Sequence, residues 1–386
     1  VHKLFRLYIS LSIDFTAYFY AFIFVGIFEY ASPVSEYLRQ LGINLPSIKN
    51  IYGASLVMSM ALFPYIFLLT KAQLSNVGLS IFKAAKSLGD NNLSAIKKVI
   101  IPSIKPVIFA GMALVIFETI SDLGGVRTLN VETFTVGIYD AWFGYQSYFS
   151  AARLAGYLLI FVLFIIFISK YFGSKSDSTA PKTAEVFEKI ELGIASKYLS
   201  TITCFLIFSF VFCMPFIQLI LWHFDNSYFD LFEHLKLLLN SVTIGIFVAL
   251  LTVFFAISLA LSYKKTRYLK PMISISTSGY AIPGSVISAG LLISFDLIFN
   301  TAITLYGILG LILCLSLRFM TPAFNYISSS LANISKSSEN ALQTHPKNSY
   351  KAFINFYLPQ IRPAILLGIM IVFIESIKEQ PATLLL

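Results

Sequence analysis

Long apolar runs separated by short polar stretches extend along the whole chain. Nine of these runs are long enough, or nearly so, for a helix across about 30 Å of hydrocarbon, which requires about 20 residues. Because the runs are continuous rather than alternating, they argue against a β-barrel, the other structure that can span a bilayer. The pattern predicts an all-α polytopic membrane protein. Its nine helices are expected near residues 7–30, 51–70, 106–121, 151–171, 198–222, 237–262, 272–295, 303–327 and 363–378.

The composition agrees with a protein of the lipid bilayer. The 386 residues are 57% hydrophobic and 12% charged, with a mean hydropathy of +0.79. A soluble protein of this length needs more polar surface than this composition supplies. The three cysteines, Cys204, Cys213 and Cys314, lie inside apolar runs without paired spacing, so we interpret them as core residues.

The charged residues are sorted by loop. If the segment His2–Arg6 lies inside, alternate loops hold 21 of the 28 Lys and Arg residues. The positive-inside rule then makes these loops cytoplasmic. The opposite loops hold mainly acidic residues. The net charge of +9 therefore reflects membrane orientation and gives little support for a nucleic-acid partner.

Residues 83–122 and 340–379 are two copies of one segment. When Pro102 is aligned with Pro359, 11 of 40 positions are identical without a gap, whereas shared apolar composition would give about three. Each copy leads from a basic cytoplasmic loop into an outward-directed apolar helix, so the copies are parallel repeats. The other identical pairs are Ala84/Ala341, Asn91/Asn348, Ala95/Ala352, Ile104/Ile361, Pro106/Pro363, Ile108/Ile365, Gly111/Gly368, Val115/Val372, Glu118/Glu375 and Ile120/Ile377.

One long polar stretch of mixed charge, residues 173–197, predicts a cytoplasmic linker between two halves. The first half then covers residues 1–172 and the second covers residues 198–386. Four predicted helices precede the linker and five follow it. Superposing the halves, with residues 12–22 matched to Tyr280–Gly290, predicts six helices per unit. We therefore expect the chain to be a fragment that lacks two helices before the first half and one after the second.

The cytoplasmic loop 71–105 is predicted to form a short helix, a turn at Gly89–Asn92 and a second helix that ends at Pro102. Ala84 and Ala85 leave the first helix open to close approach, and Gly89 permits a left-handed turn. Pro102 and the proline four residues later are predicted to break the helix where it meets the membrane. Small residues on a surface helix suit a docking partner.

A second interpretation of the same loop is that it lies on the lipid headgroups. Lys97 and Lys98 would then serve to attract anionic lipid. The sequence pattern by itself leaves both interpretations open, although duplication of the loop in both halves favours docking.

The segment KAAKSLGDNNLSAIKKVIIPSIKPVIFAG resembles the EAA loop of bacterial ABC importer permeases. Residues 122–143 and 378–386 are similar to the ferric-iron branch of that family, in which two six-helix halves of the type I unit are fused. The resemblance implies that both loops couple to ATP-binding subunits. The matching positions are Ala84, Ala85, Gly89 and Pro102 in the first half, and Ala341 and Pro359 in the second.

The second copy departs from the family pattern more than the first does. The glutamate of the motif is Lys83 in the first copy and Asn340 in the second. The second alanine is replaced by Leu342, and the glycine by Pro346. A degenerate second copy is compatible with an asymmetric contact to the ATPase or with drift in a family where shape matters more than charge.

The resemblance implies a multi-pass permease of the bacterial inner membrane that moves ferric iron from a periplasmic solute-binding protein to the cytoplasm. It also implies a pair of separate ATP-binding subunits, and no cofactor bound by this chain. The chain carries no G-x-x-x-x-G-K-[ST] motif for nucleotide, which agrees with a transport subunit that is not itself an ATPase.

Other functions remain open on the sequence. Within the family, the solute could be thiamine, a polyamine or a phosphonate. An ion-coupled secondary transporter is disfavoured by the paired coupling loops and by the small number of midplane charges. An intramembrane enzyme is disfavoured because the chain contains neither H-E-x-x-H nor G-x-S-x-G, so we predict no catalytic residues.

Two acidic pairs, Glu118/Asp122 and Glu375/Glu379, occupy matching places in the repeats. The i, i+4 spacing puts each pair on one face of its helix, near the outer end. Ionisable groups at membrane depth cost about 2.5–3.5 kcal/mol on insertion scales, so they usually face a cavity or a partner. These residues are therefore candidates for the translocation path or a receptor contact. The alternative is helix-end solvation, with Lys378 as a local ion-pair partner.

Two further features contain residues that could carry a function. Arg318 lies within an apolar run and either lines a pathway, forms a buried pair or extends to an interface. The outer loop contains possible metal ligands, but their spacing matches no ligand template, so we predict no metal site. These residues are His223, Asp225, Asp230, Glu233 and His234.

Overall fold

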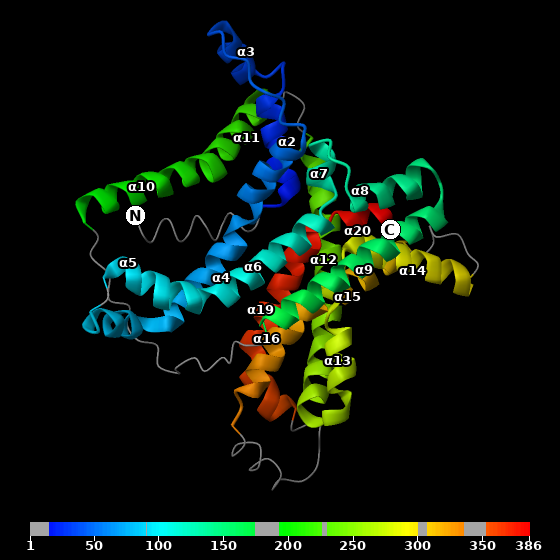
Figure 1. Ribbon diagram of the computed structural model, residues 1–386. Coiled ribbons are helices and arrows are strands. Elements are labelled where there is room, and N and C mark those ends of the chain that lie inside the picture. The colour runs from blue at the N-terminus through cyan, green and yellow to red at the C-terminus, as the bar shows by residue number, and fades with distance from the viewer. Residues whose placement is uncertain (1–14, 90, 174–192, 226–229, 300–306, 336–352) are drawn as a thin grey trace. The chain divides into compact units, whose positions relative to one another are not determined.

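The computed structural model describes residues 15–89, 91–173, 193–225, 230–299, 307–335 and 353–386, and all regular structure within these ranges is helical (Figure 1). The prediction of an all-α polytopic protein is confirmed. Seven helices in the described ranges are long and apolar enough to cross a membrane, and two bent helix pairs bring the total to nine if each pair is one span. The two bent pairs are Lys270–Ala281 with Gly284–Phe295, bent by 114°, and Gly307–Arg318 with Met320–Ala332, bent by 46°.

The chain divides into two compact units that do not coincide with the two predicted halves. Unit 1 comprises Val1–Val136 and Ile160–Ser227, and unit 2 comprises Gly137–Leu159 and Tyr228–Leu386. The predicted halves come from the repeat in the sequence, whereas the units come from contacts between residues in the structure. The boundaries 1–172 and 198–386 therefore stay a prediction. Each unit is described by itself.

Unit 1 is built on α2 (Ala17–Phe28), α4 (Ile51–Ser87) and α6 (Ile101–Ser121). The helix α4 packs against both α2 and α6. Thr16 caps the start of α2 by accepting a hydrogen bond from the backbone N–H of Phe19. The remaining helical segments that fall at least partly in this unit are α3 (Pro33–Gln40), α5 (Asn92–Ala95), η1 (Ile96–Ile100), α7 (Gly124–Thr128), α8 (Phe134–Tyr139), α9 (Tyr148–Gly173), α10 (Ile194–Phe208), η3 (Ser209–Cys213) and α11 (Met214–Asp225).

The helix α11 follows the linker in sequence but packs against α2 of the first half. Gly26 makes this contact close, because a Cβ atom at that position would lie 2.4 Å from Cζ2 of Trp222. The indole ring of Trp222 also lies edge-on to the ring of Phe22, with centroids 5.4 Å apart. This aromatic contact helps to hold the first span after the linker, Ile194–Phe224, in unit 1.

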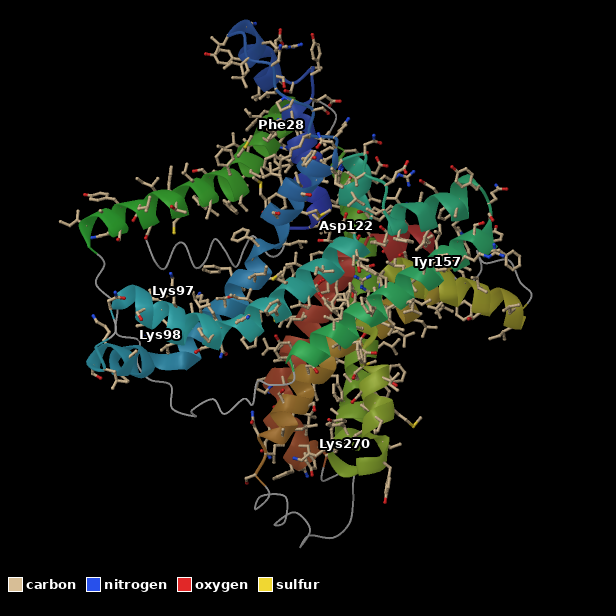
Figure 2. All side chains as sticks on the ribbon, in the orientation of Figure 1. Phe28, Lys97, Lys98, Asp122, Tyr157 and Lys270 are labelled. Carbon is tan, nitrogen blue, oxygen red and sulfur yellow. The ribbon has the colours of Figure 1, made fainter. Side chains whose placement is uncertain are left out.

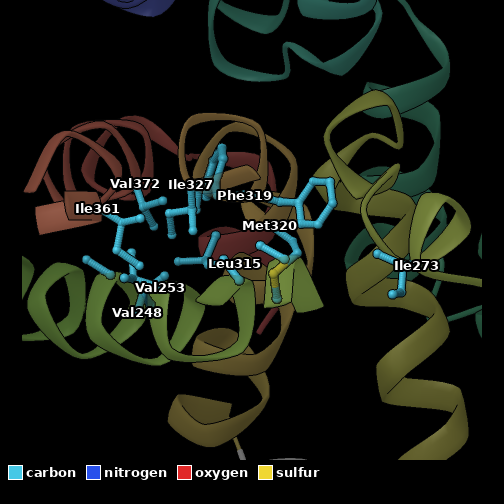
Figure 3. Packing of buried hydrophobic residues seen from close by; sticks show 14 of the residues in the cluster. Val248, Val253, Ile273, Leu315, Phe319, Met320, Ile327, Ile361 and Val372 are labelled. Atoms are coloured by element: carbon cyan, nitrogen blue, oxygen red, sulfur yellow. The ribbon is translucent and has the colours of Figure 1, made fainter. Parts of the chain in front are cut away.

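Unit 2 is centred on three mutually packed helices, α12 (Leu231–Lys265), α16 (Met320–Ala332) and α19 (Leu358–Lys378). Their facing surfaces carry small and β-branched residues, including Val253, Ile327 and Val372 (Figure 3). Helices in lipid associate through close packing, so small residues at the interface favour this arrangement. The other segments of the unit are η2 (Asp140–Gly144), η4 (Arg267–Leu269), α13 (Lys270–Ser276), η5 (Gly279–Ala281), α14 (Gly284–Phe299), α15 (Gly307–Arg318), η7 (Phe353–Tyr357) and α20 (Pro381–Leu385).

The sequence repeat is also a structural repeat. Pro359 lies 257 residues after Pro102, and the same offset relates three successive segments at both of their bounds. The π-helical turn η1 corresponds to η7, the helix α6 corresponds to α19, and the short helix α7 corresponds to α20.

The same offset also relates α4 to the bent pair α15–α16. Five buried residues of α4 between Ala54 and Leu62 have buried counterparts in unit 2. Both segments therefore turn the same face inward, although α4 is unbroken and its counterpart is bent at Phe319. The five pairs are Ala54/Leu311, Val57/Cys314, Met58/Leu315, Ala61/Arg318 and Leu62/Phe319.

The predicted helix break at the two prolines is wrong. In unit 1 the chain continues from α5 through the π-helical turn η1 into α6. Pro102 is the second residue of α6 and follows the π-helical turn almost directly, and Pro106 is accommodated within the helix. The π-helical turn changes the hydrogen-bond register just before Pro102, so the chain passes the prolines without leaving the helix.

Candidate functional site

The first half of the loop predicted to couple to the ATPase is the continuation of a membrane-length helix rather than a separate element. The helix α4 runs from the membrane through Ala84 and Ala85 to Ser87. Ala84 is exposed and Ala85 is buried, so one alanine faces outward and the other packs inward. Gly89 then adopts φ +93°, which is the left-handed turn predicted for it. In Figure 2, Lys97 and Lys98 lie near the opposite end of α6 from Asp122.

The second coupling loop lies mostly outside the described residues. Ala341 falls in that part of the chain, whereas Pro359 is exposed in the first turn of α19. The helix that leads to this loop, α16, ends at Ala332. Lys264 at the end of α12 donates a hydrogen bond from Nζ to the carbonyl oxygen of Leu331 at 2.6 Å. This charged donor satisfies a carbonyl in the last turn of α16.

The four acidic candidates have different environments. Glu118 is half-buried near the end of α6. Its counterpart Glu375 accepts a hydrogen bond from Lys378 Nζ at 3.1 Å, which is the local ion pair considered as an alternative. Asp122 ends α6 and accepts a hydrogen bond from the backbone N–H of Val126 at 2.9 Å, so it stabilises the start of α7.

Glu379 is buried and bound to Arg318. Arg318 Nη1 donates to Glu379 Oε1 at 2.9 Å, and the two side chains are only 5% and 7% exposed. The partners are 61 residues apart in sequence. Among the three interpretations of Arg318, the structure therefore selects the buried pair.

Glycine makes room for this ion pair. A Cβ atom at Gly284 would lie 2.1 Å from Glu379 Oε1 and 2.6 Å from Arg318 Nη1. A side chain at this position would collide with both charged groups. Sequence reasoning missed this position, although the Ile282–Pro283–Gly284 segment within an apolar run is a signal for a broken helix.

The two halves differ at this place. At the repeat-equivalent positions, unit 1 has Ala61 where unit 2 has Arg318, and Asp122 where unit 2 has Glu379. In unit 1 the carboxylate caps a short helix, whereas in unit 2 the longer carboxylate reaches a guanidinium. The predicted equivalence of the two acidic pairs in sequence thus does not extend to their hydrogen bonds.

The outer loop is not arranged as a metal site in the residues that the structure describes, which contain no group of three or more His, Cys, Asp or Glu side chains able to hold an ion. Asp230 instead accepts hydrogen bonds from the backbone N–H groups of Phe232 and Glu233 at the start of α12. His234 Nδ1 lies 2.6 Å from the carbonyl oxygen of Asp230.

Comparison with known proteins defines the class. Residues 2–175 match the family of binding-protein-dependent transport system inner membrane components. The second half repeats the coupling segment of the first. Together with the apolar helices, this match makes the chain a multi-pass membrane component of the inner membrane.

The similar proteins are ferric-iron permeases. The chain is 27% identical over 350 residues to the Fe(3+)-transport system permease protein FbpB 2 of Haemophilus influenzae, which covers 88% of this chain and 68% of that protein. It is 26% identical over 362 residues to the putative ferric transport system permease protein FbpB 1 of the same organism, covering 86% and 56%. No solved structure matches the chain. The predicted resemblance to the ferric-iron branch is confirmed.

The buried ion pair predicts a specific pattern of stability. Replacing Arg318→Met leaves Glu379 with its carboxylate buried beside an apolar side chain. We expect this change to lower the free energy of unfolding in detergent micelles by about 3–5 kcal/mol. The double variant Arg318→Met with Glu379→Leu should recover most of the loss, because apolar pairs of similar volume replace buried ion pairs at little cost. Additive losses in this double-mutant cycle would contradict the coupling.

Proposed function

We propose that the chain is the membrane-spanning permease subunit of an ATP-driven importer for ferric iron. The observation that carries the proposal is the similarity to ferric-iron permeases over 88% of the chain. Because the chain spans 68% and 56% of the first two relatives, the activity, substrate and partners of the whole protein are part of the proposal.

The proposed partners are two ATP-binding subunits on the cytoplasmic side and a solute-binding protein on the periplasmic side. ATP is bound and hydrolysed by the partner subunits, so this chain needs no cofactor and is not an enzyme. Closure of the ATP-binding subunits would move the coupling loops, and the membrane helices would then open the path to the other side.

The geometry of the first loop supports this mechanism. Because α4 is a single helix from Ile51 to Ser87, the loop and the membrane span form one continuous element. A helix of 37 residues is about 55 Å long, which is longer than the bilayer is thick. A push at Ala84 would therefore be transmitted along the same helix, which continues through Pro64, to its buried face at Ala61.

Uptake of radiolabelled ferric iron tests the substrate. Cells that express the full-length permease with its ATP-binding and solute-binding partners should accumulate iron, and a variant of the ATP-binding subunit without hydrolysis should abolish accumulation. Unlabelled thiamine, polyamine and phosphonate are the competitors for the alternative solutes. Competition by one of them, with no effect of ferric iron, would contradict the proposed substrate.

If Ala84 contacts an ATP-binding subunit, a large side chain at this position should uncouple ATP hydrolysis from transport. Ala84→Trp places a large side chain on an exposed helix face where close approach is required, and overpacking typically costs 1–3 kcal/mol. We expect uptake to fall about tenfold or more while the protein still inserts and ATP hydrolysis becomes independent of transport. Ala84→Ser is the matched control, since it adds no bulk. Normal uptake and normal ATPase stimulation in Ala84→Trp would refute docking at this face.

We also propose that Glu118, Asp122 and Glu375 contribute carboxylates to the outer part of the path or to the receptor contact. Parallel repeats related by a pseudo-twofold axis bring matching helix faces toward one centre, and carboxylates facing lipid would bear the insertion penalty. Glu379 is engaged by Arg318 and has a different role, argued below.

Paired neutralisation tests this assignment. Glu118→Gln combined with Glu375→Gln should lower receptor-stimulated ATPase activity several-fold more than either change alone. Glu36→Gln is the matched control, because Glu36 is an exposed carboxylate in the outer helix α3. Full activity of the double variant would contradict this assignment and would mean that the two carboxylates only solvate the ends of their helices.

A further inference from the structure

Three membrane segments of unit 2 are broken close to one point. The first break lies between Ala281 and Gly284, where the span turns by 114°. The second lies at Phe319, between α15 and α16, where the span bends by 46°. The third lies at Glu379–Gln380, between α19 and α20. Irregular backbone is tolerated at membrane depth only where protein or a water-filled cavity surrounds it.

The three breaks are in contact with one another. A Cβ atom at Gly279 would lie 2.2 Å from the carbonyl oxygen of Leu317, so the first break packs directly on the backbone of α15. The Thr321 hydroxyl donates to the carbonyl oxygen of Thr277 and accepts from the backbone N–H of Tyr280 at 3.3 Å. The hydroxyl at the second break therefore satisfies backbone groups at the first.

The Arg318–Glu379 pair joins the second break to the third. Arg318 is the last residue of α15, about 17 Å along the helix from Gly307, which is roughly half of the hydrocarbon thickness. Gly284 completes the junction, since its missing side chain admits both charged groups. The pair therefore lies deep within the membrane-spanning part of unit 2 and touches all three broken segments.

The fold does not require an ion pair at this place. Unit 1 builds the equivalent helix contacts with Ala61 and with the capping carboxylate of Asp122. A buried ion pair is often no more stable than an apolar pair of similar volume. A charged pair where three broken spans meet is therefore better explained by a process in which the contact must separate and reform.

Resting on the proposed function, we propose that Arg318 and Glu379 are positioning residues for transport, and that their ion pair is a latch. The latch holds the outer segments α14, α15 and α20 together in the state described here. It separates when the ATP-binding subunits change state, and water then reaches the junction. No covalent chemistry is involved, and the two charged groups recombine when the cycle returns.

Water access to the junction tests the latch directly. Ser285 is 1% exposed, follows Gly284 in sequence and is replaced conservatively by cysteine. The experiment uses the full-length complex in membrane vesicles, with Ser285→Cys in a background where Cys204, Cys213 and Cys314 are changed to alanine. A small water-soluble methanethiosulfonate reagent is the probe. We expect the rate of modification of the cysteine in Ser285→Cys to differ at least tenfold between the nucleotide-free and the vanadate-trapped state. Equal rates in the two states would overturn the latch.

Two substitutions separate a latch from a static brace. Gly284→Ala inserts a methyl group between the charges and should abolish the state dependence of the Ser285→Cys reaction, whereas Gly290→Ala in the same helix, with open space around it, should preserve it. The double variant Arg318→Met with Glu379→Leu should retain folded protein but lose at least tenfold in uptake. Full uptake by that folded double variant would show that the ion pair has only a structural role, which an apolar pair can fill, and would overturn the proposal.

The outcomes also separate this inference from the proposed function. A wild-type complex that imports no ferric iron contradicts the proposed substrate, and the nucleotide dependence of the Ser285→Cys reaction still decides the latch. If iron uptake is normal and that reaction is independent of nucleotide, the permease function stands and the latch is wrong.

Discussion

The bilayer interior offers the backbone no water with which to form hydrogen bonds, and the structure of this protein depends on that constraint. Each segment must satisfy its own N–H and C=O groups, so the described spans are helices. Any interruption of a helix at membrane depth needs a compensating group nearby. In unit 2, polar groups at each described break form hydrogen bonds with residues of another segment.

The compensation differs between the halves. In unit 1 the break after α6 is stabilised locally, because Asp122 accepts from Val126 and its carbonyl oxygen accepts from the Thr135 hydroxyl at 2.7 Å. In unit 2 the corresponding break relies on Arg318, which comes from a different helix. The carboxylate at the break is thus bound by a neighbouring backbone N–H in unit 1 and by a side chain of another helix in unit 2. The backbone carbonyl at the break accepts from a threonine hydroxyl in both units. The two repeats therefore differ in the partner that binds the carboxylate after α6 and after α19.

The two halves also differ in the helices that lead to the repeated loops. The helix α4 continues without interruption into the first coupling loop. The helix α16 ends at Ala332, and Lys264 from α12 binds the carbonyl oxygen of Leu331 beside that end. The more divergent coupling motif belongs to the half in which the membrane helix stops, and the better-preserved motif belongs to the half with the continuous helix. The more divergent motif and the shorter helix therefore occur in the same half.

The sequence by itself determined the class of fold, the number of candidate spans and the repeat. Hydrophobic length is a local property, and helices in lipid satisfy their backbones locally, so the runs near 51–70 and 363–378 predicted helices without knowledge of their neighbours. The turn at Gly89 was predictable for the same reason, because a left-handed residue is a property of a few adjacent positions.

Tertiary structure alone decided how the breaks are closed and which charges meet. Prolines 102 and 106 do not interrupt their helix, because a π-helical turn changes the hydrogen-bond register ahead of them. Arg318 and Glu379 are 61 residues apart, and in sequence each has several possible environments. Their meeting depends on two bends and on the space left by Gly284, and these arise only when α14, α15 and α20 pack together. Periodicity and composition describe one helix at a time, so they cannot specify an interaction that exists only where several broken helices come into contact.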